Sequence, residues 1–141
     1  MTKYFWIFAG LLLSGSVTAR AATEVEMEAC HYTPEVKREL QLSAAQEPRV
    51  EKIYSDLAPQ LQQIQNAMKE REQLRQQGAS PEEIEKATEK IIALENQCRD
   101  RGHQLLKPVL TDAQYQLILE MEEVHRRKVR ERRVAGQPAH P

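Results

Sequence analysis

The stretch Leu110-Thr111-Asp112-Ala113-Gln114 is the starting point for the fold, because a related stretch, Leu42-Ser43-Ala44-Ala45-Gln46, stands earlier in the chain. Each reads leucine, a hydroxyl residue, two further residues and glutamine. This pattern predicts a helix start: the hydroxyl oxygen accepts a hydrogen bond from the backbone N–H three residues on, and the glutamine reaches back to the N–H of the hydroxyl residue. The motif and cap residues are therefore Leu42, Ser43, Gln46, Leu110, Thr111 and Gln114.

The apolar residues after the first motif recur at steps of three and four, which is the period of an amphipathic helix. They predict a helix over about residues 44–77, with a stripe of Val50, Ile53, Tyr54, Leu57, Leu61, Ile64 and Met68. Pro59 lies inside this range and predicts a bend, since it removes one backbone hydrogen bond. The stripe keeps its phase across Pro59, so we expect one curved helix.

Gly78-Ala79-Ser80-Pro81 predicts a tight turn. Gly78 suits the left-handed position after a helix, and Ser80 with Glu83 forms a further capping box. A connection this short makes the two helices antiparallel neighbours. The second helix is expected over residues 81–107, with a weak point at Gly102 and a stripe of Ile84, Ala87, Ile91, Leu94, Cys98 and Leu105.

Two shorter helices complete the predicted fold, which is all-α with four helices. Thr33-Pro34 begins one that ends near residues 40–42, and Thr111 caps one whose apolar side is Tyr115, Ile118, Leu119, Met121 and Val124. We find no convincing strand alternation. A thin helical hairpin leaves its apolar stripes partly uncovered, so we expect a homodimer.

The N-terminus has the pattern of a secretory signal peptide over residues 1–21. Lys3 precedes an apolar run over residues 4–13, and Ala19-Arg20-Ala21 offers a small-x-small cleavage site. The run is too short for an ordinary membrane span. These features predict a periplasmic protein with a helical domain over residues 22–133 and a disordered tail over 134–141. Residues 22–33 are polar, and we expect them to be frayed except where Cys30 ties them down.

The composition argues against nucleic-acid binding. The chain has 20 basic and 21 acidic residues, and removing Lys3 and Arg20 leaves 18 basic residues and a net charge near −3. Nor does the sequence offer a Ser/His/Asp set, a glycine-rich phosphate loop or a carboxylate pair of catalytic spacing, so we expect neither an enzyme nor a cofactor.

The paired motifs, the helical hairpin between them and the export signal together resemble the LTXXQ-motif family, the small periplasmic proteins typified by Spy and CpxP. The resemblance covers roughly residues 35 to 133, with Ser43 where the family usually has threonine. It implies an intertwined, cradle-shaped helical dimer that binds clients on a basic, partly apolar concave surface. Some relatives in the broader group resemble heavy-metal sensors and zinc-binding resistance proteins.

Cys30 and Cys98 are the two cysteines, and cysteines in a small exported protein usually pair. A Cys30–Cys98 bond within one chain would pin the N-terminus onto the hairpin, and a bond between chains is the alternative. A metal site that adds His31 and His103 is a further alternative, although adjacent Cys-His and a five-residue helical step are poor ligand geometries. Glu122 and His125 have the Glu-x-x-His spacing of a bridged metal bundle, but only one copy exists.

The basic run near the end of the chain has three interpretations: a solvated helix end, a contact surface for an acidic partner or client, or a site for anionic lipid or nucleic acid. The predicted export argues against nucleic acid. Its candidate contact residues are Arg126, Arg127, Lys128 and Arg130, with Arg132 and Arg133 following. The first hypothesis for function is a periplasmic, ATP-independent chaperone for unfolded envelope proteins. The alternatives are a metal-responsive sensor or resistance protein, and a dedicated regulator that binds the periplasmic domain of one sensor kinase.

Overall fold

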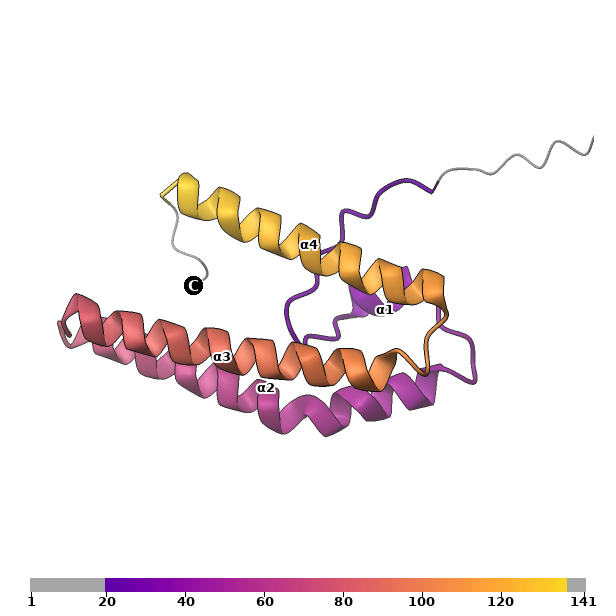
Figure 1. Cartoon of the computed structure of the whole chain (residues 1–141), viewed down its shortest axis with the longest axis horizontal. Helices are drawn as coiled ribbons and strands as arrows, with labels where there is room; N and C mark the ends of the chain where they lie inside the picture. The colour runs from indigo at the N-terminus through magenta and orange to yellow at the C-terminus, as the bar shows by residue number, and fades with distance from the viewer. Residues whose placement is uncertain (1–19, 137–141) are drawn as a thin grey trace, which may run out of the picture.

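The computed structural model describes residues 20–136. In this part the chain forms four helices and no strand: α1 (Pro34–Leu40), α2 (Glu47–Gln76), α3 (Pro81–Leu106) and α4 (Asp112–Val134). Helices α2 and α3 pack side by side as a long antiparallel hairpin, and α1 packs on α4 (Figure 1). The predicted fold class is confirmed. The predicted signal peptide and tail fall mostly on residues 1–19 and 137–141, which lie outside the described residues.

The predicted helix starts at Thr33, Ser80 and Thr111 are all present. The Thr33 hydroxyl accepts a hydrogen bond from the Val36 N–H at 3.3 Å. Both bonds of a capping box form at Ser80 and again at Thr111. Gly78, at φ 73°, takes the left-handed conformation that ends the first arm of the hairpin.

The start of α2 differs from the prediction. The box at Ser43 forms, because its hydroxyl accepts from the Gln46 N–H at 3.2 Å and the Gln46 Oε1 accepts from the Ser43 N–H at 3.0 Å. However, residues 44–46 are a turn, and the helix begins at Glu47. Pro48 explains the delay, because it has no N–H to donate to the carbonyl of Ala44.

The core runs along the hairpin and under α4, and most of the predicted stripes supply it. Leu57, Ile64, Ile91, Cys98, Ile118 and Met121 are buried. Ala67, Leu106 and Leu117 are also buried, although they were not predicted. The predicted weak point, Gly102, is buried, and a Cβ built there would lie 3.6 Å from the Leu57 Cδ1 of α2, an ordinary van der Waals contact.

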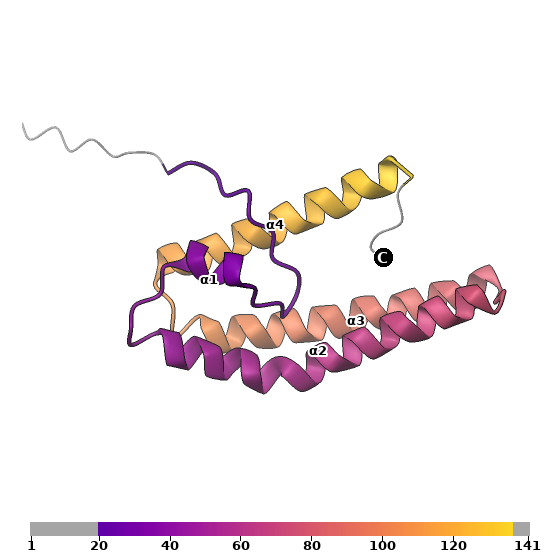
Figure 2. The same ribbon diagram turned by 180° about the vertical axis from the view of Figure 1, so that it is seen from behind.

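Residues 23–30, which we call the strap, contradict the expectation of a frayed segment. In both views the strap runs from α4 toward the hairpin before the chain returns to α1 (Figures 1 and 2). Met27 is 4 % exposed and Thr23 is 7 % exposed. The Met27 N–H donates to the Met121 carbonyl at 3.1 Å. The expectation was wrong because a polar composition does not show which side chains are buried. The few buried side chains of this segment are enough to hold it in place.

Candidate functional site

The two motif glutamines, Gln46 and Gln114, meet in space. Each donates from its Nε2 to the Oε1 of the other, at 2.8 and 3.2 Å. Each Oε1 also accepts the N–H of its own motif's hydroxyl residue, at 3.0 Å in both copies. The remaining amide hydrogens reach across the fold: Gln46 donates to the Val109 carbonyl at 3.0 Å and Gln114 to the Leu40 carbonyl at 3.1 Å. The repeated motif therefore makes one reciprocal lock between the start of α2 and the start of α4.

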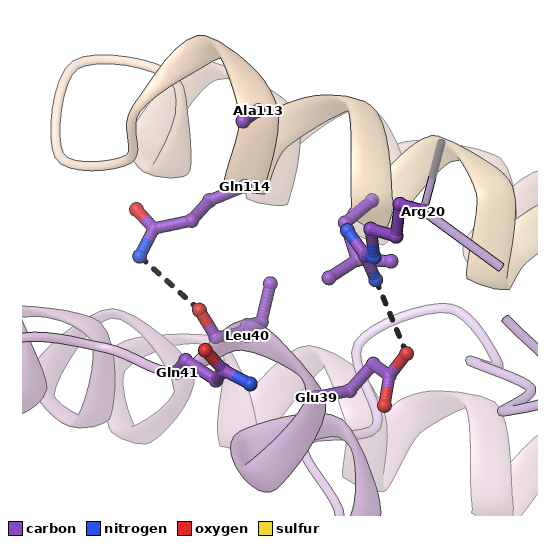
Figure 3. A pocket seen from close by; sticks show the side chains of 7 residues that line it. Arg20, Glu39, Leu40, Gln41, Ala113 and Gln114 are labelled. Carbon is purple, nitrogen blue, oxygen red and sulfur yellow. Dashed lines mark hydrogen bonds and ion pairs between the residues drawn. The ribbon is translucent and has the colours of Figure 1, made fainter. Parts of the chain in front are cut away.

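A cavity of about 460 Å³ lies beside this lock, between the end of α1 and the start of α4. Figure 3 shows the Gln114 amide pointing to the Leu40 carbonyl on one side and Arg20 pointing to Glu39 on the other. The Arg20 Nη2 lies 3.2 Å from the Glu39 Oε1. Cleavage at the predicted site after Ala21 or Ala22 would remove Arg20, so this wall of the cavity would be absent from the mature chain.

His103 joins α3 to α4 through a partly buried polar network. Its Nδ1 lies 2.8 Å from the Tyr115 hydroxyl, and its Nε2 lies 3.0 Å from the Glu122 Oε1. The Tyr115 ring also meets the imidazole edge-on, at 5.5 Å between centroids. Residue spacing did not predict this network, because its members come from different helices and Glu122 had been considered only with His125. The burial of the Glu122 carboxylate, which is 7 % exposed, would have pointed to the network, but burial cannot be read from the sequence.

The two cysteines pair within one chain: Cys30 and Cys98 form a disulfide that joins the strap to α3. Cys98 is fully buried and Cys30 is 8 % exposed. Two residues further on, Tyr32 stacks on Tyr54 of α2, with ring centroids 4.4 Å apart. The strap is thus fastened to α3, and the residues just after it are fastened to α2.

A groove lies beside the strap, where the C-terminal half of α4 faces the hairpin. Two adjoining cavities of about 280 and 110 Å³ form it, and both are bordered by Glu28, Glu95, His125, Val129 and Arg133. Apolar side chains along the groove are Met68, Ile91, Ile92 and Val129, and basic ones are Arg71, Arg99, Arg126, Arg130 and Arg133. Ile92 is 46 % exposed, so part of this apolar surface faces solvent. The groove combines positive charge with apolar contact area.

Burial shifts the pKa values of an acidic and a basic residue of the groove in opposite directions. Burial raises the pKa of Glu95, and the negative charge of Glu28 adds to this shift. Burial lowers the pKa of Arg71, and the positive charge of Arg75 adds to it. The Arg71 Nε is buried and has no hydrogen-bond partner among the described residues. The far end of the groove therefore carries positive charge that an incoming carboxylate would stabilise.

The predicted basic contact residues do not all face the groove. Arg126 and Arg130 border it, and both pair with Glu123, at 2.8 and 3.0 Å. Arg127 is not among the residues that border the groove, and its Nε lies 4.0 Å from Glu131. Lys128 donates to the Glu24 carbonyl of the strap at 3.4 Å.

The structure also places the residues of the alternative metal site. His31 Nδ1 pairs with Glu28 at 2.9 Å, whereas His103 lies in the network with Tyr115 and Glu122. Both cysteine sulfurs are used in the disulfide. Within residues 20–136 no three His, Cys, Asp or Glu side chains are grouped in a way that would hold a metal ion.

Comparison with protein-family models, with curated proteins and with solved structures found no match to this chain. In the described part of the chain, no helix combines the length and the apolarity that crossing a membrane requires.

Proposed function

We propose that this protein is a periplasmic, ATP-independent chaperone that holds unfolded envelope proteins in the groove between α4 and the hairpin. The observation that carries the proposal is the lining of the groove, where arginines from three helices stand beside Met68, Ile92 and Val129. Such a surface suits a partner without one fixed shape, because long-range charge attracts the chain and non-directional apolar contact retains it. The resemblance to LTXXQ-motif proteins supports the same function.

Capture and retention would depend on different residues. Arg130 is exposed at the edge of the groove and would speed the encounter with acidic segments, with an effect that falls as salt rises. Val129 borders both cavities and would slow release, since its contact area is apolar. Release would need no nucleotide, because a client that folds buries the apolar side chains that it had offered to the groove.

Light scattering from an aggregating unfolded client, in buffer free of nucleotide, tests this function. The protein should suppress aggregation at near-equimolar concentration for several unrelated clients. Val129→Ser and Arg130→Ser should each weaken suppression, whereas Arg127→Ser, on the same helix but outside the groove, should not. Absence of suppression with every client would refute the proposal.

A further inference from the structure

The strap has a regular sequence pattern, because acidic and apolar residues alternate over Glu24-Val25-Glu26-Met27-Glu28-Ala29. It forms no helix over residues 20–28. In an extended chain, successive side chains point to opposite sides. The strap can therefore present its acids to one surface and its apolar side chains to another.

Its contacts follow this alternation. Met27 is buried in the core, and Val25 is partly buried against it. The Glu26 carboxylate lies 3.6 Å from the Arg132 Nη2 and 3.5 Å from the His125 Nδ1, both on α4. The body of the protein thus already binds one extended acidic and apolar segment, and that segment is its own N-terminal strap.

The groove continues the surface that the strap occupies. Met27, Glu28 and Ala29 of the strap border its larger cavity, and beyond them lie Arg130, Arg133 and Val129. Charge complementarity therefore extends past the end of the strap, toward the buried and unpaired Nε of Arg71.

We propose that the strap is an internal competitor for a binding surface. The surface that the strap covers, which we call its seat, and the adjoining groove bind an extended segment in which acidic and apolar residues alternate. The Cys30–Cys98 disulfide controls access to that seat. The disulfide makes occupation by the strap permanent, since a covalent bond holds it to α3. Without the bond, the strap stays only through noncovalent contacts, and an external segment can compete. The inference rests on the proposed function for its biological client, whereas a peptide alone tests the seat and its control.

The controlling step is thiol–disulfide exchange with a dithiol reductant. A thiolate of the reductant attacks the Sγ of Cys30, the less buried cysteine, and the S–S bond breaks with the electron pair going to the Sγ of Cys98. Cys98 takes up a proton. The second thiol of the reductant then displaces Cys30, which leaves as a thiol after taking up the second proton. The cysteine pair gains two electrons and two protons, and the dithiol is oxidised to a disulfide.

Fluorescence anisotropy of a labelled peptide with the sequence of residues 22–33, carrying Ser in place of Cys30, tests the inference on the full chain. The peptide should bind the protein reduced with a dithiol at least about tenfold more tightly than the oxidised protein, because in the oxidised form the Cys30–Cys98 cross-link prevents the strap from leaving its position. A peptide of the same composition with its three glutamates placed together should bind more weakly. Equal binding to both redox forms, or to both peptides, would overturn the inference.

A pair of strap variants sharpens the test. In the reduced protein, Met27→Ser should tighten peptide binding further, because it removes the buried anchor of the competitor. Glu24→Gln should leave binding unchanged, since the Glu24 contact to Lys128 uses the backbone carbonyl. Circular dichroism of the reduced wild-type chain shows whether the helices persist, and their loss would overturn the inference, because the disulfide would then be needed for the fold itself.

The two proposals fail in different ways. If peptide binding depends on reduction but neither redox form suppresses aggregation, the proposed chaperone function is refuted and the proposed peptide-binding seat is retained. If both redox forms suppress aggregation equally and neither binds the peptide, the proposed seat is refuted and the proposed chaperone function is retained.

Discussion

At the scale of single residues, the motif glutamines explain why the pattern requires an amide at its last position. The Oε1 of Gln114 accepts two hydrogen bonds, while its Nε2 donates to Gln46 and to the Leu40 carbonyl. A carboxylate could accept the first pair but could not donate the second. Since Gln46 makes the same set of bonds in reverse, each glutamine satisfies polar groups of two distant segments.

The lock predicts a coupled loss of stability. Gln114→Ala should lower the free energy of unfolding by about 1–3 kcal/mol, since partly buried donors and acceptors lose their partners. Gln46→Ala should cost a similar amount, and the double variant should cost less than the sum, because both remove the same bonds. Urea denaturation measures all three, with Gln116→Ala on the exposed face of α4 as the control. Strict additivity would contradict the lock.

His31 predicts a pH dependence of stability. The hydrogen bond to Glu28 raises the pKa of His31 above its ordinary value of 6.5, with smaller help from the charge of Glu95. Because the folded-state pKa is the higher one, the stabilisation is fully present below about pH 6.5 and is lost as the pH rises through the raised pKa. Urea denaturation should therefore show a larger loss for Glu28→Gln at about pH 6 than at about pH 9. A loss independent of pH would show that His31 does not make this contribution.

At the scale of elements, the hairpin is set by its turn and by the packing of its two helices. Gly78 permits the short connection, and Leu57 of α2 packs beside Gly102 of α3. These two glycines have different physical roles. The first needs its positive φ, whereas the second is an ordinary helical residue with space beside it.

Substitution by alanine should therefore have opposite signs at the two positions. Gly78→Ala should destabilise the folded protein by about 1–2 kcal/mol, since the left-handed conformation is unfavourable for alanine. Gly102→Ala should stabilise by about 0.5–1 kcal/mol through helix propensity, because the added Cβ meets only an ordinary contact at 3.6 Å. Thermal unfolding measures both. A loss at Gly102 as large as that at Gly78 would show that the α2–α3 contact has no room for a methyl group.

At the scale of the whole molecule, α4 is attached to the hairpin by four different means. They are the glutamine lock, the network around His103, shared core side chains such as Ile118 and Met121, and the strap. Three of these are noncovalent. Apart from the chain itself, the disulfide is the one covalent cross-link between the strap and the hairpin in the described part of the chain.

Reduction of the disulfide should therefore lower stability without removing the helices. The bond closes a loop with a sequence separation of 68 residues, for which the chain-entropy model gives about 4 kcal/mol. Urea denaturation with and without a thiol reductant measures the difference. Hydrogen exchange should localise the early effect to residues 23–30 and the facing side of α4. Exchange that rises first in the α2–α3 turn would contradict this account.

The local features of the fold were predictable because local chemistry produces them. Ser80 and Thr111 cap helices, Gly78 ends one, and the three-and-four spacing of Val50, Ile53 and Leu57 marks a buried face. The start of α2 was missed by three residues, since the effect of Pro48 on the first turn outweighed the cap at Ser43. The pairing of Cys30 with Cys98 was expected from the presence of two cysteines and from the predicted export signal.

The candidate site was less predictable, because its parts come from segments far apart in the chain. The amino-acid sequence alone specified four helices, the caps of three of them, the hairpin and a basic α4, since each depends on neighbouring residues. Tertiary packing alone brought Gln46 to Gln114, placed His103 between Tyr115 and Glu122, and laid the strap along α4. The physical reason is that hydrogen bonds and charge pairs act over a few ångströms, so which distant groups come that close depends on how the apolar faces of the helices pack.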